Sequence, residues 1–379
     1  MKIDRFESFL LGNSYVLRLT TDTGVSGIGA SACWGYPEAV ERIVNIFKDY
    51  LIGQNPLRIE HQWQYMARFS HFRGGAIMGA ISAIDIALWG IAGKHFGVPA
   101  YQLLGGKTRN KARVYYHVRG DTKEKLIQGV KDARAQGFTA VGHLTPFLDD
   151  SRKVPFFKTH VDKIKDAIRT VAAYREAAGD EVDLCIEIHR RLSPAEAIVL
   201  ARGIEEYHPF FYEDPILPEN FDAMELVANH IAIPIATGEW FHSIHEFAML
   251  LKRGAVQYVR PDVCMAGGLS HGKKIAAIAE AHYVGVVPHN PLSPVSTAAC
   301  LQLAACIPNF ALQEYPTGEH EPPKNEIVKT TIKLENGYLI IPTEPGIGIE
   351  LAEGAQEKYP PRPREVLSRL NIDGSVVDQ

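Results

Sequence analysis

The chain has 379 residues, which exceeds the ~250–300 residues at which a single hydrophobic core usually stops growing. One large domain and a smaller one are therefore expected. Apolar residues make up 46% and charged residues 22% of the chain, as in ordinary soluble globular proteins. The formal net charge is −4 and no basic stripe is visible, which argues against a nucleic-acid partner. An anionic substrate stays open, because a bound cation can invert the local field.

The N-terminal residues lead straight into an alternating strand pattern, so they do not predict a signal peptide. No stretch approaches the ~18 uninterrupted apolar residues of a membrane span, so no membrane partner is expected. Buried, reduced thiols fit a cytoplasmic protein, and the cysteine pattern argues against a zinc site without excluding one. The five cysteines form no CxxC pair; they are Cys33, Cys185, Cys264, Cys300 and Cys306.

The first 110 residues predict an α+β domain. Residues 1–30 alternate apolar and polar side chains around a Thr-Gly turn, which predicts a hairpin or short meander. Helical patterns follow at residues 37–50 and 76–96, the second rich in Ala and other small residues. Gly97 and Pro99 end that helix.

From residue 112 short apolar runs alternate with helical segments, in about eight strand–helix units. This rhythm predicts an α/β fold with a parallel sheet closed into a (β/α)₈ barrel. We place the cap at residues 1–110, the barrel at 111–328, and a C-terminal segment that returns to the cap at 329–379. The expected helices lie at residues 123–136, 158–178, 193–206, 221–229, 243–253, 269–283 and 294–306.

Three glutamates close three consecutive apolar runs. Glu213 follows Glu187 by 26 positions, and Glu239 follows Glu213 by 26 positions, about one strand–helix unit each. Because the carboxyl ends of barrel strands meet on one face, the three carboxylates are expected to converge. Clustered like charges repel unless a cation neutralises them, and oxygen-only ligands suit Mg²⁺. The sequence therefore predicts a Mg²⁺ site.

Polar residues that could act as acid or base close the neighbouring strands. His189 lies two residues past Glu187, on the same side if the strand stays extended. Asp262 and His289 close the two apolar runs that follow the one closed by Glu239. A carboxylate that accepts a hydrogen bond from an imidazole orients the ring and raises its basicity. Glu314 closes the last strand, where it could bond to a substrate oxygen.

These residues, taken together, resemble the enolase superfamily, specifically its mandelate racemase-like branch. The strings that carry the resemblance are IEIHRR, FFYEDP, IATGEW, VRPDVCMAGGL, VPHNPLSP and LQEYP, in the order that the branch uses. The resemblance spans nearly the whole chain and implies an α+β capping domain over a modified barrel. The histidine after the first ligand and the PHNPLSP string are similar to galactonate and mannonate dehydratases.

The sequence departs from the branch at two places. The first metal ligand is usually Asp, whereas this chain has Glu187, whose extra methylene moves the carboxylate outward. Many relatives carry a Lys-x-Lys base motif on the second barrel strand, but Gly142 and Leu144 stand there, so no lysine base can act from that side.

The resemblance implies a lyase that removes water from a sugar acid. His289, oriented by Asp262, would take the C2 proton, and His189 would protonate the departing 3-hydroxyl, giving a 2-keto-3-deoxy acid. A racemase needs bases on both faces of C2, so the missing lysines favour dehydration. The alternatives are a cycloisomerase or epimerase of a sugar acid lactone or anhydro acid, and a non-catalytic homologue.

Several further residues are expected to bind the sugar acid. Trp34 and Arg73 of the first domain could face the pocket, and Tyr116 ends the first barrel strand, where only alternate side chains point inward. His143 could replace a lysine as a binder of the substrate carboxylate. A cytoplasmic homo-oligomer is also expected.

Overall fold

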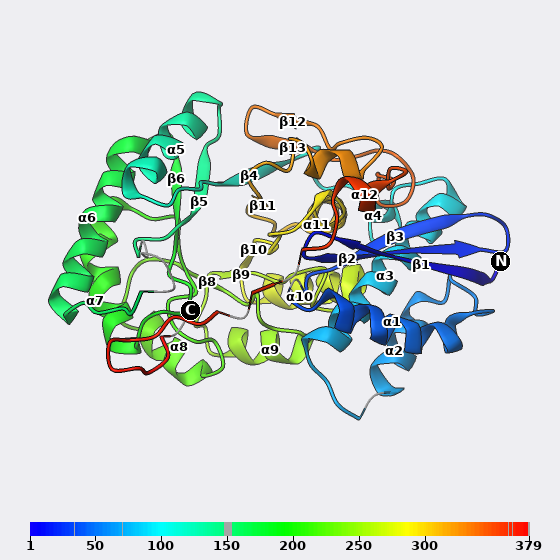
Figure 1. Ribbon diagram of the computed structural model, residues 1–379, viewed down its shortest axis with the longest axis horizontal. Helices are drawn as coiled ribbons and strands as arrows, with labels where there is room; N and C mark the ends of the chain where they lie inside the picture. Colours follow the sequence, from blue (N-terminus) through cyan, green and yellow to red (C-terminus); the bar gives the residue numbers. More distant parts are fainter. Residues whose placement is uncertain (34, 70, 148–153, 363, 366, 378–379) are drawn as a thin grey trace.

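The computed structural model has a cap and a barrel, joined along one side (Figure 1). The cap holds the N-terminal sheet and its helices, and the barrel holds parallel strands surrounded by helices, so the predicted fold class is confirmed. The structure describes residues 1–33, 35–69, 71–147, 154–362, 364–365 and 367–377.

The cap sheet is the predicted meander, with three antiparallel strands in the order β1-β2-β3. Its strands are β1 (Ile3–Leu11), β2 (Ser14–Thr21) and β3 (Ser26–Ser31). Two cap helices were predicted, and the described residues form four: α1 (Pro37–Leu51), α2 (Ile59–Phe69), α3 (Gly75–Phe96) and α4 (Ala100–Leu103). Helix α2 was not predicted, although Ile59, Trp63 and Met66 have helical spacing and are buried.

Helix α3 packs very closely on strand β3 because the residues that face each other, such as Gly29 and Ala83, have small side chains or none. A Cβ atom at Gly27 or Gly29 would lie 2.1 or 2.0 Å from the carbonyl oxygens of Ala87 and Ala83. Helix α3 is long and apolar enough to span a membrane, but 78% of its most apolar window is buried. Its apolar character is that of a core helix between the cap sheet and the barrel.

In the part of the chain that the structure describes, eight parallel strands form the barrel, in chain order around the ring. β11 pairs with β4, and a bridge between Val286 and Phe310 joins β10 to the β11 segment, which closes the ring. The strands are β4 (Lys111–His117), β5 (Ala140–Leu144), β6 (Asp183–Glu187), β7 (Phe211–Glu213), β8 (Ile235–Thr237), β9 (Tyr258–Val259), β10 (Gly285–Val286) and β11 (Gln313–Tyr315).

Within the described residues, seven α-helices connect these strands. They are α5 (Lys123–Ala135), α6 (His160–Ala178), α7 (Pro194–Ile204), α8 (Phe221–Ala228), α9 (Ile244–Lys252), α10 (Gly268–Ala281) and α11 (Pro294–Cys306). All but α10 begin with a Ser, Thr or Asn side chain that accepts a hydrogen bond from a first-turn N–H. After β11, the described chain forms a short 3₁₀ helix η2 (Lys324–Ile327) in place of an eighth barrel helix. In this respect the barrel differs from a regular (β/α)₈ barrel, in which an α-helix follows each strand.

The C-terminal segment first extends the barrel sheet and then reaches the cap. Strand β13 (Tyr338–Ile340) pairs antiparallel with β4 and with β12 (Leu334–Glu335). Gly346 then accepts a hydrogen bond from the backbone of Ala100, and the short helix α12 (Ala355–Lys358) packs near β1. The cap is also joined to the barrel by Asp85 of α3, which accepts two hydrogen bonds from Ser270 of α10.

Candidate active site

Three glutamates meet at the carboxyl ends of β6, β7 and β8. Glu187 and Glu213 are register partners at the ends of their strands, and Glu239 follows the end of β8 by two residues. One carboxylate oxygen from each lies within 4.8 Å of the others. The longer side chain of Glu187 is held in place by the backbone N–H of His189, which donates to its Oε1 at 2.7 Å. The three carboxylates thus form a group that suits a divalent cation.

Arg260 supports the triad from inside the barrel. Its side chain is 1% exposed, and its Nε lies 2.5 Å from Glu213 Oε1, while its Nη2 donates to Glu314 Oε2 at 2.6 Å. The Tyr115 hydroxyl donates to the other oxygen of Glu213 at 3.3 Å. Burial nevertheless raises the pKa of Glu213 well above its usual range, with Glu187 adding to the effect of burial.

A second arginine, Arg190, holds Glu239. Its Nη1 donates to Glu239 at 2.7 Å and also bonds to Asp214, which in turn accepts a hydrogen bond from Thr237. Burial raises the pKa of Glu239, but the charges of His289 and Arg190 outweigh burial and lower it to about 2. Burial, Glu239 and Asp214 together raise the pKa of Glu187 to about 8. A cation is the group that would relieve this repulsion.

His289 and Asp262 form the predicted dyad. Asp262 Oδ2 lies 2.7 Å from Nδ1 of His289, and Asp262 Oδ1 accepts a hydrogen bond from the backbone of Cys264. These bonds fix the ring, so that Nε2 faces Glu239 Oε2 at 3.5 Å. Burial lowers the pKa of His289, but Glu239, Glu314 and Asp262 outweigh it and raise the pKa to about 9.

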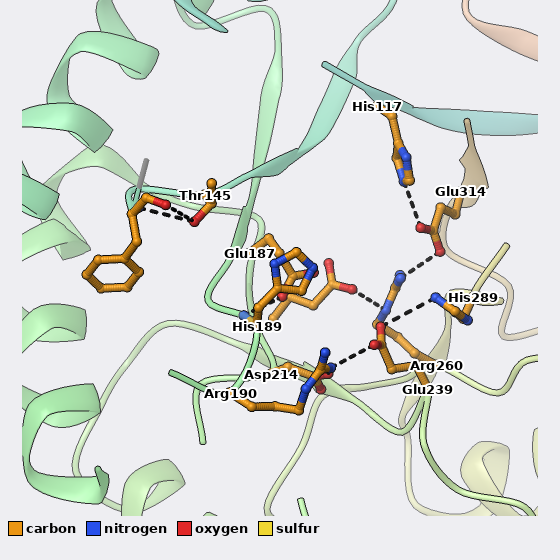
Figure 2. A network of polar contacts seen from close by, with 12 residues as sticks. His117, Thr145, Glu187, His189, Arg190, Asp214, Glu239, Arg260, His289 and Glu314 are labelled. Atoms are coloured by element: carbon orange, nitrogen blue, oxygen red, sulfur yellow. Dashed lines mark hydrogen bonds and ion pairs between the residues drawn. The ribbon is translucent and has the colours of Figure 1, made fainter. Parts of the chain in front are cut away.

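His189 lies on the other side of the carboxylates from His289 (Figure 2). β6 ends at Glu187, and His189 and Arg190 adopt the left-handed region with φ of 53° and 64°. A turn, rather than the extended strand that was predicted, therefore places the ring. Burial and Arg190, opposed by Glu239, lower the pKa of His189 to about 3. His143 stacks edge-to-face on His189, with ring centroids 4.9 Å apart.

Glu314 is held by protein groups on both oxygens. Its Oε1 bonds to His117 Nε2 at 2.7 Å, and its Oε2 accepts from Arg260 and from the backbone of Asn290 (Figure 2). Arg260 and His289, acting against burial, keep the pKa of Glu314 well below its usual range. Glu314 therefore fixes His117 and Arg260 around the cavity.

The strand β4 places its side chains differently from the prediction. Tyr116 points outward, where its ring stacks on Phe138 with centroids 4.2 Å apart, so it does not line the cavity. The neighbours Tyr115 and His117 point inward instead. Because successive residues of a strand face opposite sides, choosing Tyr116 was wrong by one position, and His117 was missed.

Of the two predicted cap residues, only Arg73 belongs to the part of the chain that the structure describes. Arg73 lines a separate cavity of about 650 Å³ between α2 and α9, together with Trp63 and His242, so its predicted place was wrong. Trp34 lies outside the described residues.

The active-site cavity has a volume of about 520 Å³. Its lining includes residues that sequence reasoning did not single out as functional, namely Arg190, Arg191, Trp240 and Arg364, beside the predicted His143, Glu187, His189, Glu239, His289 and Glu314. Among the described lining residues there is no lysine. At Gly142, one of the two positions where many relatives carry a lysine, a Cβ would lie 2.2 Å from the Tyr115 ring, so a larger side chain does not fit there.

Family models match both parts of the chain. Residues 12–105 match the N-terminal domain of the mandelate racemase/muconate lactonizing enzyme family, and residues 128–355 match the enolase C-terminal domain-like family. The chain belongs to the mandelate racemase/muconate lactonizing enzyme family of the enolase superfamily.

Relatives in this family cover the full chain. The D-galactonate dehydratase of Ralstonia pickettii (strain 12J) is 38% identical over all of both chains, and that of Cronobacter sakazakii is 37% identical over 93% of each. The crystal structure of an enolase from Agrobacterium radiobacter, with bound sodium and L-malate, has a TM-score of 0.92 at 30% identity over all of both chains. The chain is a dehydratase, a hydro-lyase, of this superfamily.

Cation binding should change the protonation of His289. Because Glu239 and its neighbours raise the pKa of His289 above its ordinary value near 6.5, the protonated ring stabilises the metal-free fold fully below pH 6.5. This stabilisation is lost as the pH rises through about 9. A divalent cation on Glu239 offsets that negative charge, so we expect Mg²⁺ to lower the pKa of His289 and release a proton at neutral pH. NMR titration of the His289 ring with and without Mg²⁺ checks this, and an unchanged pKa would contradict it.

Proposed function

We propose that the protein is a magnesium-dependent sugar acid dehydratase that acts on an aldonate, such as a hexonate, and yields a 2-keto-3-deoxy acid. The observation that carries this proposal is the placement of two imidazoles, His189 and His289, on either side of three converging carboxylates. The names of the D-galactonate dehydratases that share 37–38% identity support the same substrate class.

The carboxylate group fits Mg²⁺ by its chemistry. Glu187, Glu213 and Glu239 offer only oxygen ligands, and the repulsion among them favours a divalent cation. When bound, Mg²⁺ stabilises the negative charge that develops on the substrate carboxylate as the C2 proton leaves. Arg260 and Arg190 hold two of the ligands from behind, so the group is preorganised.

His289 is suited to remove the C2 proton. Its Nδ1 is occupied by Asp262, so Nε2 is the nitrogen available to a substrate. The ring must be neutral to accept a proton, which is why the loss of the Glu239 charge to a cation matters. Asp262 then stabilises the imidazolium that forms.

His189 is suited to protonate the leaving 3-hydroxyl. Its ring lies beside Glu187, with His189 Nε2 3.8 Å from Glu187 Oε2, on the face away from His289. Its lowered pKa makes the ring neutral before substrate arrives. The negative charge of the enediolate would raise that pKa, so the ring would take up a proton from solvent and pass it to the departing 3-hydroxyl, which leaves as water.

A panel of sugar acids tests the proposal. Incubation of hexonates, pentonates and aldarates with the enzyme and Mg²⁺ should give a 2-keto product from at least one acid, and none after EDTA treatment. A ring-opened or stereoinverted product, with no 2-keto acid from any member of the panel, would reject dehydration in favour of cycloisomerisation or epimerisation.

A further inference from the structure

A second group of metal-ligating atoms lies at the carboxyl ends of β5 and β6. One ring nitrogen each of His143 and His189 and one carboxylate oxygen of Glu187 lie within 4.8 Å of one another. The two rings also contact each other edge to face, with centroids 4.9 Å apart. This group shares Glu187 with the glutamate triad but contains two nitrogen donors, which the triad does not.

An irregular backbone presents both imidazoles to the same cavity. His143 and His189 adopt the left-handed conformation, with φ of 55° and 53°. At His143 the pairing of β5 with β6 shifts register between Val141 and Leu144. A left-handed conformation is uncommon for residues other than glycine, and it persists where the surrounding structure fixes it, often at functional sites. Both histidines line the active-site cavity as a result.

The ring nitrogens of these two histidines are available to a ligand. In the part of the chain that the structure describes, no hydrogen bond reaches a ring nitrogen of His143 or His189. The nearby His117 differs, because its Nε2 bonds to Glu314 at 2.7 Å. His189 lies beside Glu187 (Figure 2), but its Nε2 is 3.8 Å from Glu187 Oε2, which is beyond hydrogen-bond distance.

We propose that His143, His189 and Glu187 form a second metal site, which binds Zn²⁺. Two imidazoles and a carboxylate are a ligand set that proteins use for Zn²⁺, with bonds of about 2.0–2.2 Å and a fourth position open to water. Ligand atoms on one such ion lie at most about 4.2 Å apart, so movements of about half an ångström complete the site. Mg²⁺ prefers the oxygen-only triad, whereas imidazole nitrogens favour transition ions.

Zn²⁺ at this site should inhibit the enzyme, and this consequence rests on the proposed function. The nitrogen of His189 that coordinates Zn²⁺ cannot at the same time carry a proton to the leaving 3-hydroxyl. Glu187 would also be shared between the two cations. We therefore expect Zn²⁺ to lower the rate of dehydration even when Mg²⁺ is in excess.

X-ray absorption at the zinc K-edge identifies the ligands directly. The wild-type protein in excess Mg²⁺, with one equivalent of Zn²⁺, should show two imidazole ligands on the zinc ion. His143→Gln should show at most one. Oxygen ligands alone would place Zn²⁺ in the glutamate triad and overturn the proposal. An unchanged pair of imidazoles in His143→Gln would overturn it as well.

Calorimetric titration with Zn²⁺ in excess Mg²⁺ measures the contribution of His143. Because loss of a group that only supports a ligand already costs about 10–100-fold in metal affinity, loss of a ligand itself in His143→Gln should weaken Zn²⁺ binding by about 100-fold or more. Its Mg²⁺ affinity should change by less than about threefold, since Mg²⁺ takes oxygen ligands. His242→Gln is the matched control: His242 lines the separate cavity between α2 and α9, so its loss should leave Zn²⁺ binding unchanged. Equal Zn²⁺ affinity in the wild type and His143→Gln contradicts the proposal.

The second metal site and the proposed function fail in different ways. If no acid gives a 2-keto product, the proposed function fails, and the absorption spectrum and the Zn²⁺ titration still test the site. If dehydration occurs, its rate should fall to half near the Zn²⁺ concentration that half-fills the site. A full rate of dehydration with the site occupied would overturn the inhibition.

Discussion

Replacing His289 with asparagine should lower the turnover number of dehydration by about 10³-fold and stop exchange of the C2 proton with solvent. Asparagine keeps a polar group that can bond to Asp262, so the loss reports the missing base rather than a collapsed site. The expected effect is large because Nε2 of His289 is the ring nitrogen that faces Glu239, one of the three proposed metal ligands. Proton NMR in D₂O, with substrate and Mg²⁺, measures both quantities.

His189→Asn is the matched comparison for that experiment. It should block elimination of the 3-hydroxyl but leave C2 exchange in place, because proton removal belongs to the opposite imidazole. Exchange that persists in His289→Asn and disappears in His189→Asn would reverse the two assignments.

Arg260→Met should lower the free energy of unfolding of the metal-free protein by about 3–5 kcal/mol. The guanidinium is 1% exposed and neutralises two buried carboxylates, Glu213 at 2.5 Å and Glu314 at 2.6 Å. Methionine fills much of the same space but leaves both carboxylates without their cation. Chemical denaturation at neutral pH without Mg²⁺ measures the difference.

Arg253→Met provides a control on the protein surface. Arg253 Nε lies 2.7 Å from Asp222, whose side chain is 80% exposed, so its loss should cost less than about 1 kcal/mol. Equal stability losses for Arg260→Met and Arg253→Met would show that the buried arginine is not what neutralises the carboxylates.

The barrel could be predicted from the sequence because residues close together in the chain mark where each strand and helix begins and ends. Each predicted helix begins within about two residues of the observed one, and side chains such as Ser193, Ser243 and Ser293 cap the helices where the apolar pattern changes. The three glutamates were found for the same reason, since each follows directly on an apolar run.

The sequence predicts less well which individual side chains of these strands point into the barrel. Barrel strands are buried on both faces, so β4 shows no clear alternation of apolar and polar residues, and Tyr115, Tyr116 and His117 look equivalent in sequence. The ring of Tyr115 fills the barrel next to Gly142, which sets the register and turns Tyr116 outward.

The positions of residues that depend on contacts between distant parts of the chain could not be predicted from the local sequence. Arg73 follows α2, and its position depends on how the cap meets α9, which no nearby residue specifies. Arg364 reaches the cavity only because the C-terminal segment is bound at Gly12 and at Phe156, far away in the chain. Arg260 combines a buried charge with two partners from β7 and β11, which only the closed barrel brings together.

The proposed site removes water across C2 and C3 of a sugar acid. The most direct measurement is NMR of the product formed in D₂O with Mg²⁺ from the best acid of the panel. We predict a 2-keto-3-deoxy acid with one deuterium at C3, since solvent supplies that hydrogen when the enol tautomerises. A product that keeps its 3-hydroxyl, with deuterium at an inverted C2 or in a rearranged ring, would contradict the account.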